Sequence, residues 1–202
     1  NLVGAFFRPD AVLIDTSLLE TLPHHFFTDG CAEVLKYGAI ADEDLFSLLE
    51  KPLVARDSRL KEVIRRCVEI KRDIVQEDEF EQGRRQLLNF GHTLGHAIER
   101  CSNFEITHGY AVACGMALVA RACSIRGLCG ESSADRLFTV LRSYGFSCET
   151  DFDSSSLYQA ALLDKKRKGD SISVVLVRGM GKAFCKSLDL EEFRRFVADA
   201  CG

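Results

Sequence analysis

The sequence predicts a mainly helical domain with one short strand and one β-hairpin. Three observations support this fold class. Apolar residues recur at gaps of three and four between residues 57 and 75, which is the pattern of an amphipathic helix. Residues 108–126 are apolar nearly all round, so they predict a helix at the centre of the core. Two strand-like runs flank Gly179-Met180-Gly181 and predict a hairpin.

In the N-terminal half, the first expected element is a strand. Ala11–Ile14 is a short apolar run bounded by Pro9 and Asp15, which is typical of a buried strand. The next residues, to Pro23, predict a turn with one helical piece. Three helices are then expected, from a cap at Thr28 or Asp29 to Gly38 or Ala41, over Asp42–Glu50, and from Asp57 to about residue 75.

In the C-terminal half, further helices surround the apolar one, and the hairpin precedes the last of them. Asp189 and Glu192 form a capping box, which marks the start of that last helix. The expected elements are helices over Arg84–Glu99, from His108 to about Arg126, over Ser132–Tyr144 and over Ser155–Lys168, and strands over Ile172–Arg178 and Lys182–Ser187.

The composition excludes several classes of protein. Among the 202 residues, 47% are hydrophobic and 28% charged, which is ordinary for a globular chain. A net charge of −4 gives no reason to expect nucleic acid or an anionic membrane as partner, and we find no apolar run near the length of a membrane span. The nine cysteines form no C-x-x-C pair and predict reduced thiols in a cytoplasmic protein.

The stretch Arg84–Glu99 carries the strongest candidates for chemistry. As one helix it would place His92 and His96 on the same side, because they are four residues apart. Gly91 and Gly95 would each cost about 1 kcal/mol in a helix relative to Ala, which suggests that another helix or a ligand approaches the backbone closely.

The spacing of His92 and His96 is that of a helical metal pair. Thr93 stands where H-E-x-x-H zinc proteases carry Glu, so that class is disfavoured. Spacing alone leaves a metal or catalytic role and a surface role open. His108 adds weight, because it opens an apolar helix, where the dipole disfavours a cationic ring and suits a neutral ligand. The alternative for His108 is a partly buried ring bonded to a backbone carbonyl.

Other charged groups admit an ordinary interpretation when taken alone. Glu33 and Lys36 are three apart on an apolar helix, which is the spacing of a solvated ion pair. Lys71 and Arg72 end a long helix, where cations suit the dipole. The run from Asp164 to Lys168 resembles a solvated basic helix end.

Taken together, five motifs resemble the C-terminal domain of the 3-dehydroquinate synthase family. They follow that family's order and approximate spacing and cover essentially the whole chain. The motifs are Asn1-Leu-Val-Gly-Ala-Phe6, Ala32-Glu-Val-Leu-Lys-Tyr-Gly38, Leu88-Asn-Phe-Gly-His-Thr-Leu-Gly-His-Ala-Ile-Glu99, His108-Gly-x-Ala-Val-Ala-x-Gly-Met116 and Asp164-Lys-Lys166. The forms around Lys36 and His92 look more like the dehydroquinate enzyme than like related sugar-phosphate cyclases.

The resemblance implies roles for individual residues. It implies a divalent metal, usually zinc and alternatively cobalt, held by Glu33, His92 and His108. It implies that the residues lining the substrate site are Lys36, Lys71, Arg85, Asn89 and His96, together with Asn1 and one of the pair Lys165 and Lys166, of which we favour Lys166. It also implies that the segment with Leu18 and Thr21 touches the nucleotide. Tyr110 departs from the pattern, since many relatives carry Glu there.

The same resemblance implies a reaction. The family converts the acidic sugar phosphate 3-deoxy-D-arabino-heptulosonate 7-phosphate to 3-dehydroquinate and phosphate, using NAD, in the shikimate pathway to aromatic amino acids. It implies a homodimer and an N-terminal NAD-binding domain. No glycine-rich turn of such a domain occurs here, and the chain starts at Asn1 without Met, so we interpret residues 1–202 as the C-terminal domain of a longer chain, inactive alone.

Two rival functions remain at this stage. A metal-dependent polyol dehydrogenase of similar architecture would need a metal and NAD but few phosphate-binding cations, so Lys71 and Arg85 argue against it. A non-catalytic helical module that binds a partner would leave the set of Glu33, His92 and His108 unexplained.

Overall fold

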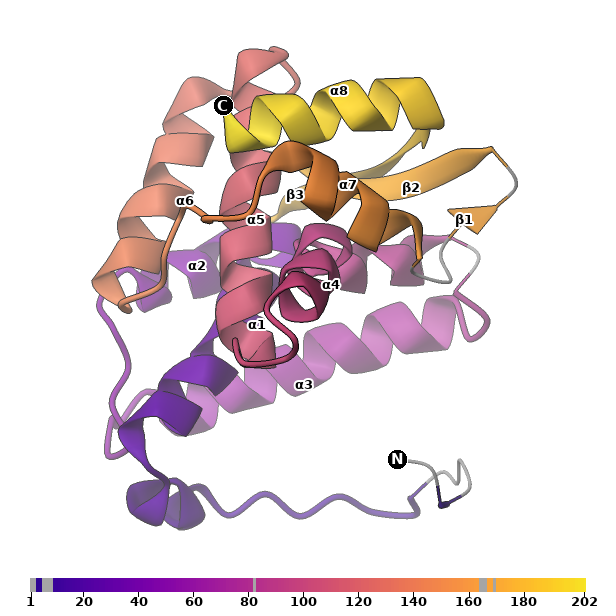
Figure 1. Cartoon of the computed structure of the whole chain (residues 1–202). Helices are drawn as coiled ribbons and strands as arrows, with labels where there is room; N and C mark the ends of the chain where they lie inside the picture. The colour runs from indigo at the N-terminus through magenta and orange to yellow at the C-terminus, as the bar shows by residue number, and fades with distance from the viewer. Residues whose placement is uncertain (1–2, 5–8, 82, 164–166, 169) are drawn as a thin grey trace.

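The computed structural model describes the chain apart from residues 1–2, 5–8, 82, 164–166 and 169. It is mainly helical with one small sheet, as the sequence predicts (Figure 1), but the helix expected over Ser155–Lys168 ends at Leu162, and Arg167–Lys168 form a strand instead. The α-helices are α1 His24–Ala41, α2 Glu43–Leu49, α3 Leu60–Glu77, α4 His92–Cys101, α5 His108–Ile125, α6 Glu131–Ser143, α7 Ser154–Leu162 and α8 Leu190–Cys201. Two 3-10 helices are η1 Thr16–Thr21 and η2 Arg84–Asn89, and the strands are β1 Arg167–Lys168, β2 Ser171–Gly179 and β3 Lys182–Asp189.

Helix α5 forms the centre of the core, as its all-round apolar sequence predicts. It packs against α1, α4, α6 and α8, and it also touches β2. By length and composition α5 would suffice to cross a membrane, so the expectation that no apolar run comes near that length is wrong. However, 72% of its apolar window is buried inside the protein, which is the behaviour of a core helix.

The three strands form an antiparallel sheet in the order β1-β2-β3, and β2 and β3 form the predicted hairpin. Val175 pairs with Cys185 near the middle of the hairpin, and a bulge lies between Val177 and Gly179. Helix α8 follows β3 directly and begins where Asp189 accepts a hydrogen bond from the backbone N–H of Glu192. That contact confirms the predicted helix start.

The predicted single helix over Arg84–Glu99 is wrong. The stretch divides into η2 and α4, and the break lies at Gly91, whose φ of 78° is left-handed. A side chain on Gly91 would stand 2.5 Å from Met116 Cγ and 2.7 Å from the Val112 carbonyl oxygen. Gly91 therefore permits both the sharp turn and the close approach to α5. The expectation that another helix approaches this backbone is confirmed.

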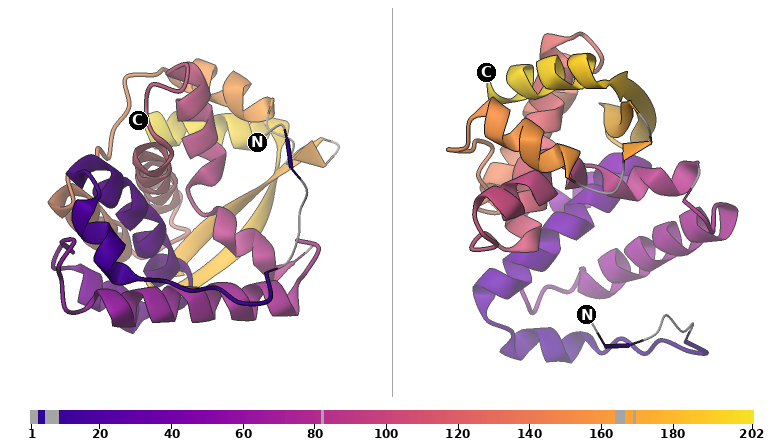
Figure 2. Two further views of the ribbon diagram at one scale, coloured as in Figure 1. Left: turned by 90° about the horizontal axis from the view of Figure 1, so that it is seen from below. Right: turned by 45° about the vertical axis from the view of Figure 1, so that its right-hand side comes forward.

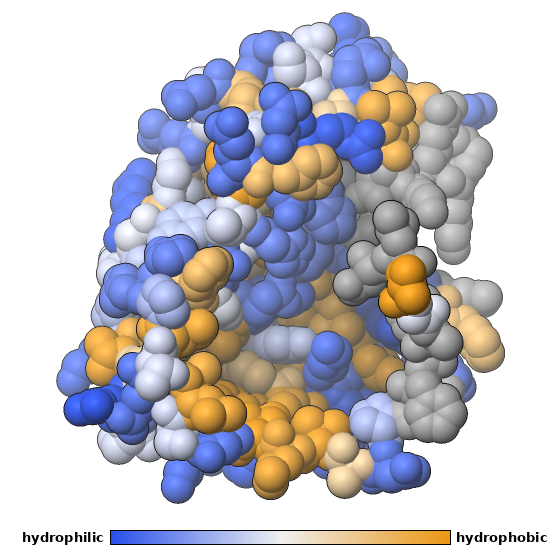
Figure 3. Space-filling model, turned by 60° about the horizontal axis from the view of Figure 1, so that its bottom comes forward, coloured by the Kyte–Doolittle hydropathy of each residue, from blue (hydrophilic) through white to orange (hydrophobic). Residues whose placement is uncertain are grey.

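The predicted strand over Ala11–Ile14 is also wrong. These residues belong to no strand, and Val12 and Leu13 are exposed at 72% and 96%. The N-terminal segment runs along α3 (Figure 2). A cavity of about 1170 Å³ is lined by residues 13–17 and Glu20 on one side and by residues of α3 on the other. Figure 3 shows that this side of the molecule is hollowed, with hydrophobic side chains gathered along one edge of the hollow. A strand needs a paired neighbour, and none of the described residues supplies one here.

The sequence suggested Thr28 or Asp29 as the cap of the helix that follows them. Asp29 instead lies inside α1 and caps α5. Its Oδ1 accepts from the backbone N–H of Tyr110 at 3.1 Å and from the Thr107 hydroxyl. Helix α1 begins earlier than predicted, after Pro23. Asp29 thus ties the start of α5 to α1 and satisfies one of the N–H groups that every helix start leaves without an intrahelical partner.

We expect Asp29→Ala to lower the free energy of unfolding by about 1 kcal/mol, with a range of roughly 0.5–2, because the start of α5 loses its capping oxygen. Urea denaturation followed by circular dichroism measures this loss. Asp135→Ala, at an exposed position within α6, is the matched control and should change stability by less than about 0.5 kcal/mol. Equal stability of Asp29→Ala and the wild type would contradict the capping role.

Candidate metal and substrate site

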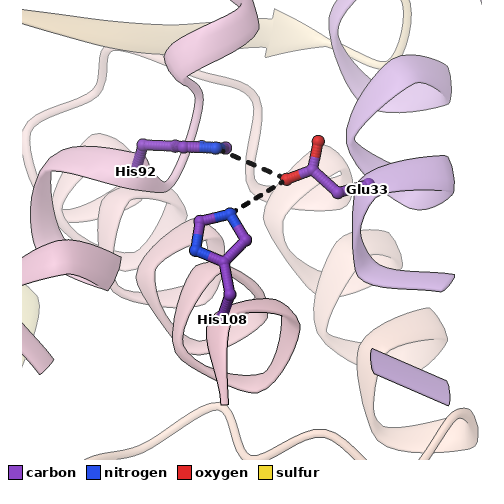
Figure 4. Close-up of side chains that lie close together, drawn as sticks. All are labelled: Glu33, His92 and His108. Carbon is purple, nitrogen blue, oxygen red and sulfur yellow. Dashed lines mark ion pairs between the residues drawn. The ribbon is translucent and has the colours of Figure 1, made fainter. Parts of the chain in front are cut away.

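Three helices bring one carboxylate and two imidazoles to the same point (Figure 4). Glu33 lies on α1, His92 is the first residue of α4, and His108 is the first residue of α5. Both rings stand at helix N-termini, where the dipole disfavours a cationic ring and suits a neutral one. The site therefore depends on how three helices pack rather than on spacing along any one of them.

The donor atoms of these side chains lie close enough to share one cation. Glu33 Oε1 is 3.4 Å from His92 Nε2 and 3.7 Å from His108 Nε2, and the three donor atoms lie within 4.8 Å of one another. Glu33 Oε1 is buried and has no hydrogen-bond partner among the described residues. A buried oxygen without a partner is costly, and a divalent metal held by these three groups would satisfy it.

Hydrogen bonds on the far side of each ring leave the inner nitrogens available. His92 Nδ1 lies 3.2 Å from the Phe90 carbonyl oxygen, which can only accept, so Nδ1 carries the proton of this bond. His108 Nδ1 lies 3.2 Å from Glu99 Oε1, and the same reasoning applies. Each Nε2 then keeps its lone pair toward Glu33, so the donor set fits a zinc-like divalent metal.

Glu33 divides its two oxygens between two tasks. Lys36 donates from Nζ to Glu33 Oε2 at 2.5 Å, and the Lys36 side chain is only 3% exposed. Burial opposes ionisation of Glu33, but the neighbouring His108 and Lys36 outweigh it and lower the pKa of Glu33 to about 2. Burial lowers the pKa of Lys36, and Glu33 opposes that shift. One oxygen therefore neutralises a buried cation while the other faces the imidazoles.

The family model described as 3-dehydroquinate synthase C-terminal matches residues 30–167. The chain belongs to this 3-dehydroquinate synthase family. The 3-dehydroquinate synthase of Clostridium perfringens strain 13 is 40% identical over 197 residues, which are 96% of this chain and 56% of that relative. The enzyme of Clostridium beijerinckii is 41% identical over 198 residues, with the same coverage. The chain thus spans little more than half the length of the curated relatives it matches.

Solved structures of sugar-phosphate cyclases share the fold of this chain. The 2-epi-5-epi-valiolone synthase of Streptomyces hygroscopicus, with NAD+ and Zn2+ bound, aligns with 99% of this chain and 58% of its own, at a TM-score of 0.85 and 27% identity. A 2-deoxy-scyllo-inosose synthase complexed with carbaglucose-6-phosphate, NAD+ and Co2+ aligns with 98% of this chain and 59% of its own, at a TM-score of 0.79 and 25% identity.

His96 lies beside the three converging groups. Its ring centroid is 5.4 Å from that of His92 and 5.8 Å from that of His108. It also belongs to a second group of possible donors, with Glu99 and His108, whose atoms lie within 4.8 Å of one another. The fold therefore places His96 next to the site, and its assignment to the substrate rather than to the metal stays a prediction.

Lys71, Arg85 and Asn89 lie on two elements that precede α4 in the chain, α3 and η2. Lys71 lies on α3, exposed, and near enough to Lys36 for its charge to help lower the pKa of Lys36, although burial is the larger cause. Arg85 and Asn89 lie on η2, just before the break at Gly91. Arg85 Nη1 donates to the Glu79 carbonyl oxygen at 2.6 Å, and Asn89 Nδ2 donates to Glu81 Oε1 at 2.6 Å. These contacts hold both side chains toward the turn at 78–81.

No contact between Leu18 or Thr21 and the cluster is found among the described residues. Leu18 and Thr21 lie on η1, where Leu18 is 70% exposed and the Thr21 hydroxyl donates to the Leu18 carbonyl oxygen at 3.2 Å. Asn1, Lys165 and Lys166 fall outside the described residues. Tyr110 packs edge-on against Phe146, with ring centroids 5.1 Å apart.

Sequence reasoning missed two residues that support the site. Asp29 lies one turn before Glu33 on α1 and caps the helix that His108 begins. Glu99 lies three residues after His96 on α4 and bonds to His108. Helical spacing could have found both, because each stands three or four residues from a residue that the sequence had already singled out.

Proposed function

We propose that this chain is the catalytic C-terminal domain of a 3-dehydroquinate synthase, a carbon–oxygen lyase that converts 3-deoxy-D-arabino-heptulosonate 7-phosphate to 3-dehydroquinate and phosphate. The convergence of Glu33, His92 and His108 beside the buried Lys36 carries the proposal. Family membership and the names of the relatives support it. The neighbours bound to NAD+ with Zn2+ or Co2+ support NAD and a divalent metal as cofactors, and carbaglucose-6-phosphate supports a sugar phosphate as substrate.

The proposed division of labour places most of the NAD contacts outside this chain. The chain spans 56% of the length of its relatives, so an N-terminal nucleotide domain would supply the remainder. In this proposal, Leu18 and Thr21 on η1 meet the nucleotide from the C-terminal side. Residues 1–202 alone would then bind the metal but would not turn over substrate.

The residues of this chain would bind and orient an anionic substrate. Glu33, His92 and His108 would hold the metal, and Lys36 would keep Glu33 ionised while facing the substrate as a buried cation. A bound NAD would supply reversible hydride transfer, and a metal held by these three residues would supply Lewis-acid polarisation of a substrate oxygen. Lys71, Arg85 and Lys166 would pair with the carboxylate and phosphate, and Asn89 and His96 would hydrogen-bond to hydroxyl groups.

A turnover assay of the intact protein tests the proposal. With NAD and Co2+ or Zn2+ present, we expect release of one phosphate per 3-dehydroquinate formed, without net accumulation of NADH, because the cofactor is regenerated in each cycle. Oxidation of an unphosphorylated polyol with stoichiometric NADH would instead identify a polyol dehydrogenase. Release of phosphate from a different sugar phosphate would identify another cyclase of the same family.

We expect Lys36→Met to lower kcat/KM by about 10–100-fold, because the substrate loses a charge-assisted hydrogen bond worth about 1.5–3 kcal/mol. Steady-state phosphate release measures the effect, and the melting temperature of each variant separates it from loss of folding. Lys182→Met, at an exposed position in β3, is the matched control and should keep normal kinetics. Normal kinetics of Lys36→Met would exclude Lys36 from the substrate site.

A further inference from the structure

Glu99 makes a contact that none of the expected site roles uses. Its Oε1 lies 3.2 Å from His108 Nδ1, on the opposite edge of the ring from Glu33. The Glu99 side chain is 15% exposed, whereas that of His108 is 44% exposed. A mostly buried carboxylate needs a partner, and this imidazole N–H is the one that the described residues place against it. The ring of His108 is therefore held between two carboxylates.

The chemistry of the two partners decides where the ring proton lies. An ionised carboxylate only accepts, so the hydrogen bond to Glu99 requires the proton on His108 Nδ1. The lone pair of a neutral ring is then on Nε2, which faces Glu33 Oε1 at 3.7 Å. The same bond fixes rotation of the ring about its Cβ–Cγ bond. His108 is the first residue of α5.

The packing of α4 places Glu99 beside His108. His92, His96 and Glu99 lie at intervals of four and three residues, so they share one face of α4. The opposite face of α4 carries Leu94 and Ile98, which are buried in the core. Helix α4 therefore supplies both His92 and the carboxylate that orients His108. The packing of this one helix determines the positions of both imidazole rings.

A direct role of Glu99 as a metal ligand is the competing interpretation. Glu99, His96 and His108 form a second group of possible donors whose atoms lie within 4.8 Å of one another. However, a metal there and a metal at Glu33 would together need both nitrogens of His108, and a neutral ring offers one lone pair. The His108 ring has Glu33 at its Nε2 edge and Glu99 at its Nδ1 edge. This arrangement suits one metal at Nε2, with Glu99 as a hydrogen-bond acceptor outside the coordination sphere.

We propose that Glu99 is a positioning residue, which orients His108 so that its Nε2 faces the metal position beside Glu33. The inference rests on the metal site of the proposed function. Outer carboxylates on metal-bound histidines fix the tautomer and raise the basicity of the ligand, and their loss costs about 10–100-fold in metal affinity. We therefore expect Glu99 to affect metal affinity without itself binding the metal.

Co2+ titration of the intact, metal-free protein tests the inference, with the visible absorption of bound Co2+ as signal. We expect one Co2+ per chain in the wild type. Glu99→Leu should weaken Co2+ binding about 10–100-fold. Glu99→Gln should weaken it less, because the amide oxygen still accepts from Nδ1. Glu191→Gln, an exposed carboxylate on α8, is the matched control and should bind as the wild type does.

A second readout follows the hydrogen bond itself. In the Zn2+-loaded protein, the NMR signal of the His108 Nδ1–H should exchange slowly with water, and Glu99→Leu should accelerate that exchange. Should Glu99→Leu fail to fold, the affinity and exchange rate of Glu99→Gln decide. Unchanged affinity in both variants, or two Co2+ per chain of which Glu99→Leu loses one, overturns the positioning role. Absence of Co2+ binding by the wild type overturns the proposed function together with the inference.

Discussion

Glu33→Gln is expected to abolish metal binding under conditions in which the wild type holds one divalent metal per chain. Gln is similar in size to Glu and keeps an oxygen for the hydrogen bond from Lys36, but it removes the negative charge that faces His92 and His108. The loss should exceed the 10–100-fold that is usual for an outer partner of a ligand, and so be more than about 100-fold. Metal content after dialysis and Co2+ titration both measure it.

Two further substitutions make the assignment of ligands specific. His92→Ala should lose the metal as Glu33→Gln does, whereas His96→Ala should retain it, because His96 is expected to face the substrate. Glu62→Gln, an exposed carboxylate on α3, is the matched control for a change of charge. Stoichiometric metal in Glu33→Gln, or loss of metal in His96→Ala, would contradict the set of Glu33, His92 and His108.

The sequence could indicate these ligands only through family resemblance. Helical spacing favours His92 with His96, since both lie on one face of one helix. Glu33 and His108 are far from them in sequence, and their approach depends on how α5 packs against both α1 and α4. Local patterns do not encode such packing. The helix break at Gly91 could not be predicted from local sequence either, because it arises where Met116 and Val112 of α5 leave no room for a side chain.

The fold was predictable where a periodic pattern decides the structure. The apolar spacing of α3 and the all-round apolar surface of α5 identified both helices, although α3 begins three residues later than predicted. Prediction failed where a distant contact decides. Asp29 looks like a cap for its own helix, yet its carboxylate caps α5. The apolar run Ala11–Ile14 looks like a buried strand, yet it pairs with no described strand and is exposed.

The sequence predicted that another helix or a ligand approaches the backbone at Gly91 and Gly95. Gly115 lies opposite them on α5, and its substitution tests how closely the two helices pack. A Cβ on Gly115 would lie 2.1 Å from the Gly91 carbonyl oxygen and 2.7 Å from the Gly95 nitrogen. Those two backbone atoms form a hydrogen bond of 2.8 Å in the first turn of α4. Neither atom can rotate away as a side chain could, so the extra methyl group must push the two helices apart.

We therefore expect Gly115→Ala to lower the free energy of unfolding by about 3 kcal/mol, the upper end of the usual cost of overpacking, even though Ala favours a helix by about 1 kcal/mol over Gly. Gly30→Ala is the matched control, because a Cβ there meets nothing within 4 Å, and it should stabilise α1. Urea denaturation of both variants gives the comparison. Since Gly91 precedes His92, the displacement of α4 should also weaken Co2+ binding in Gly115→Ala protein that remains folded. Wild-type stability of Gly115→Ala would mean that α4 and α5 lie further apart than the structure places them.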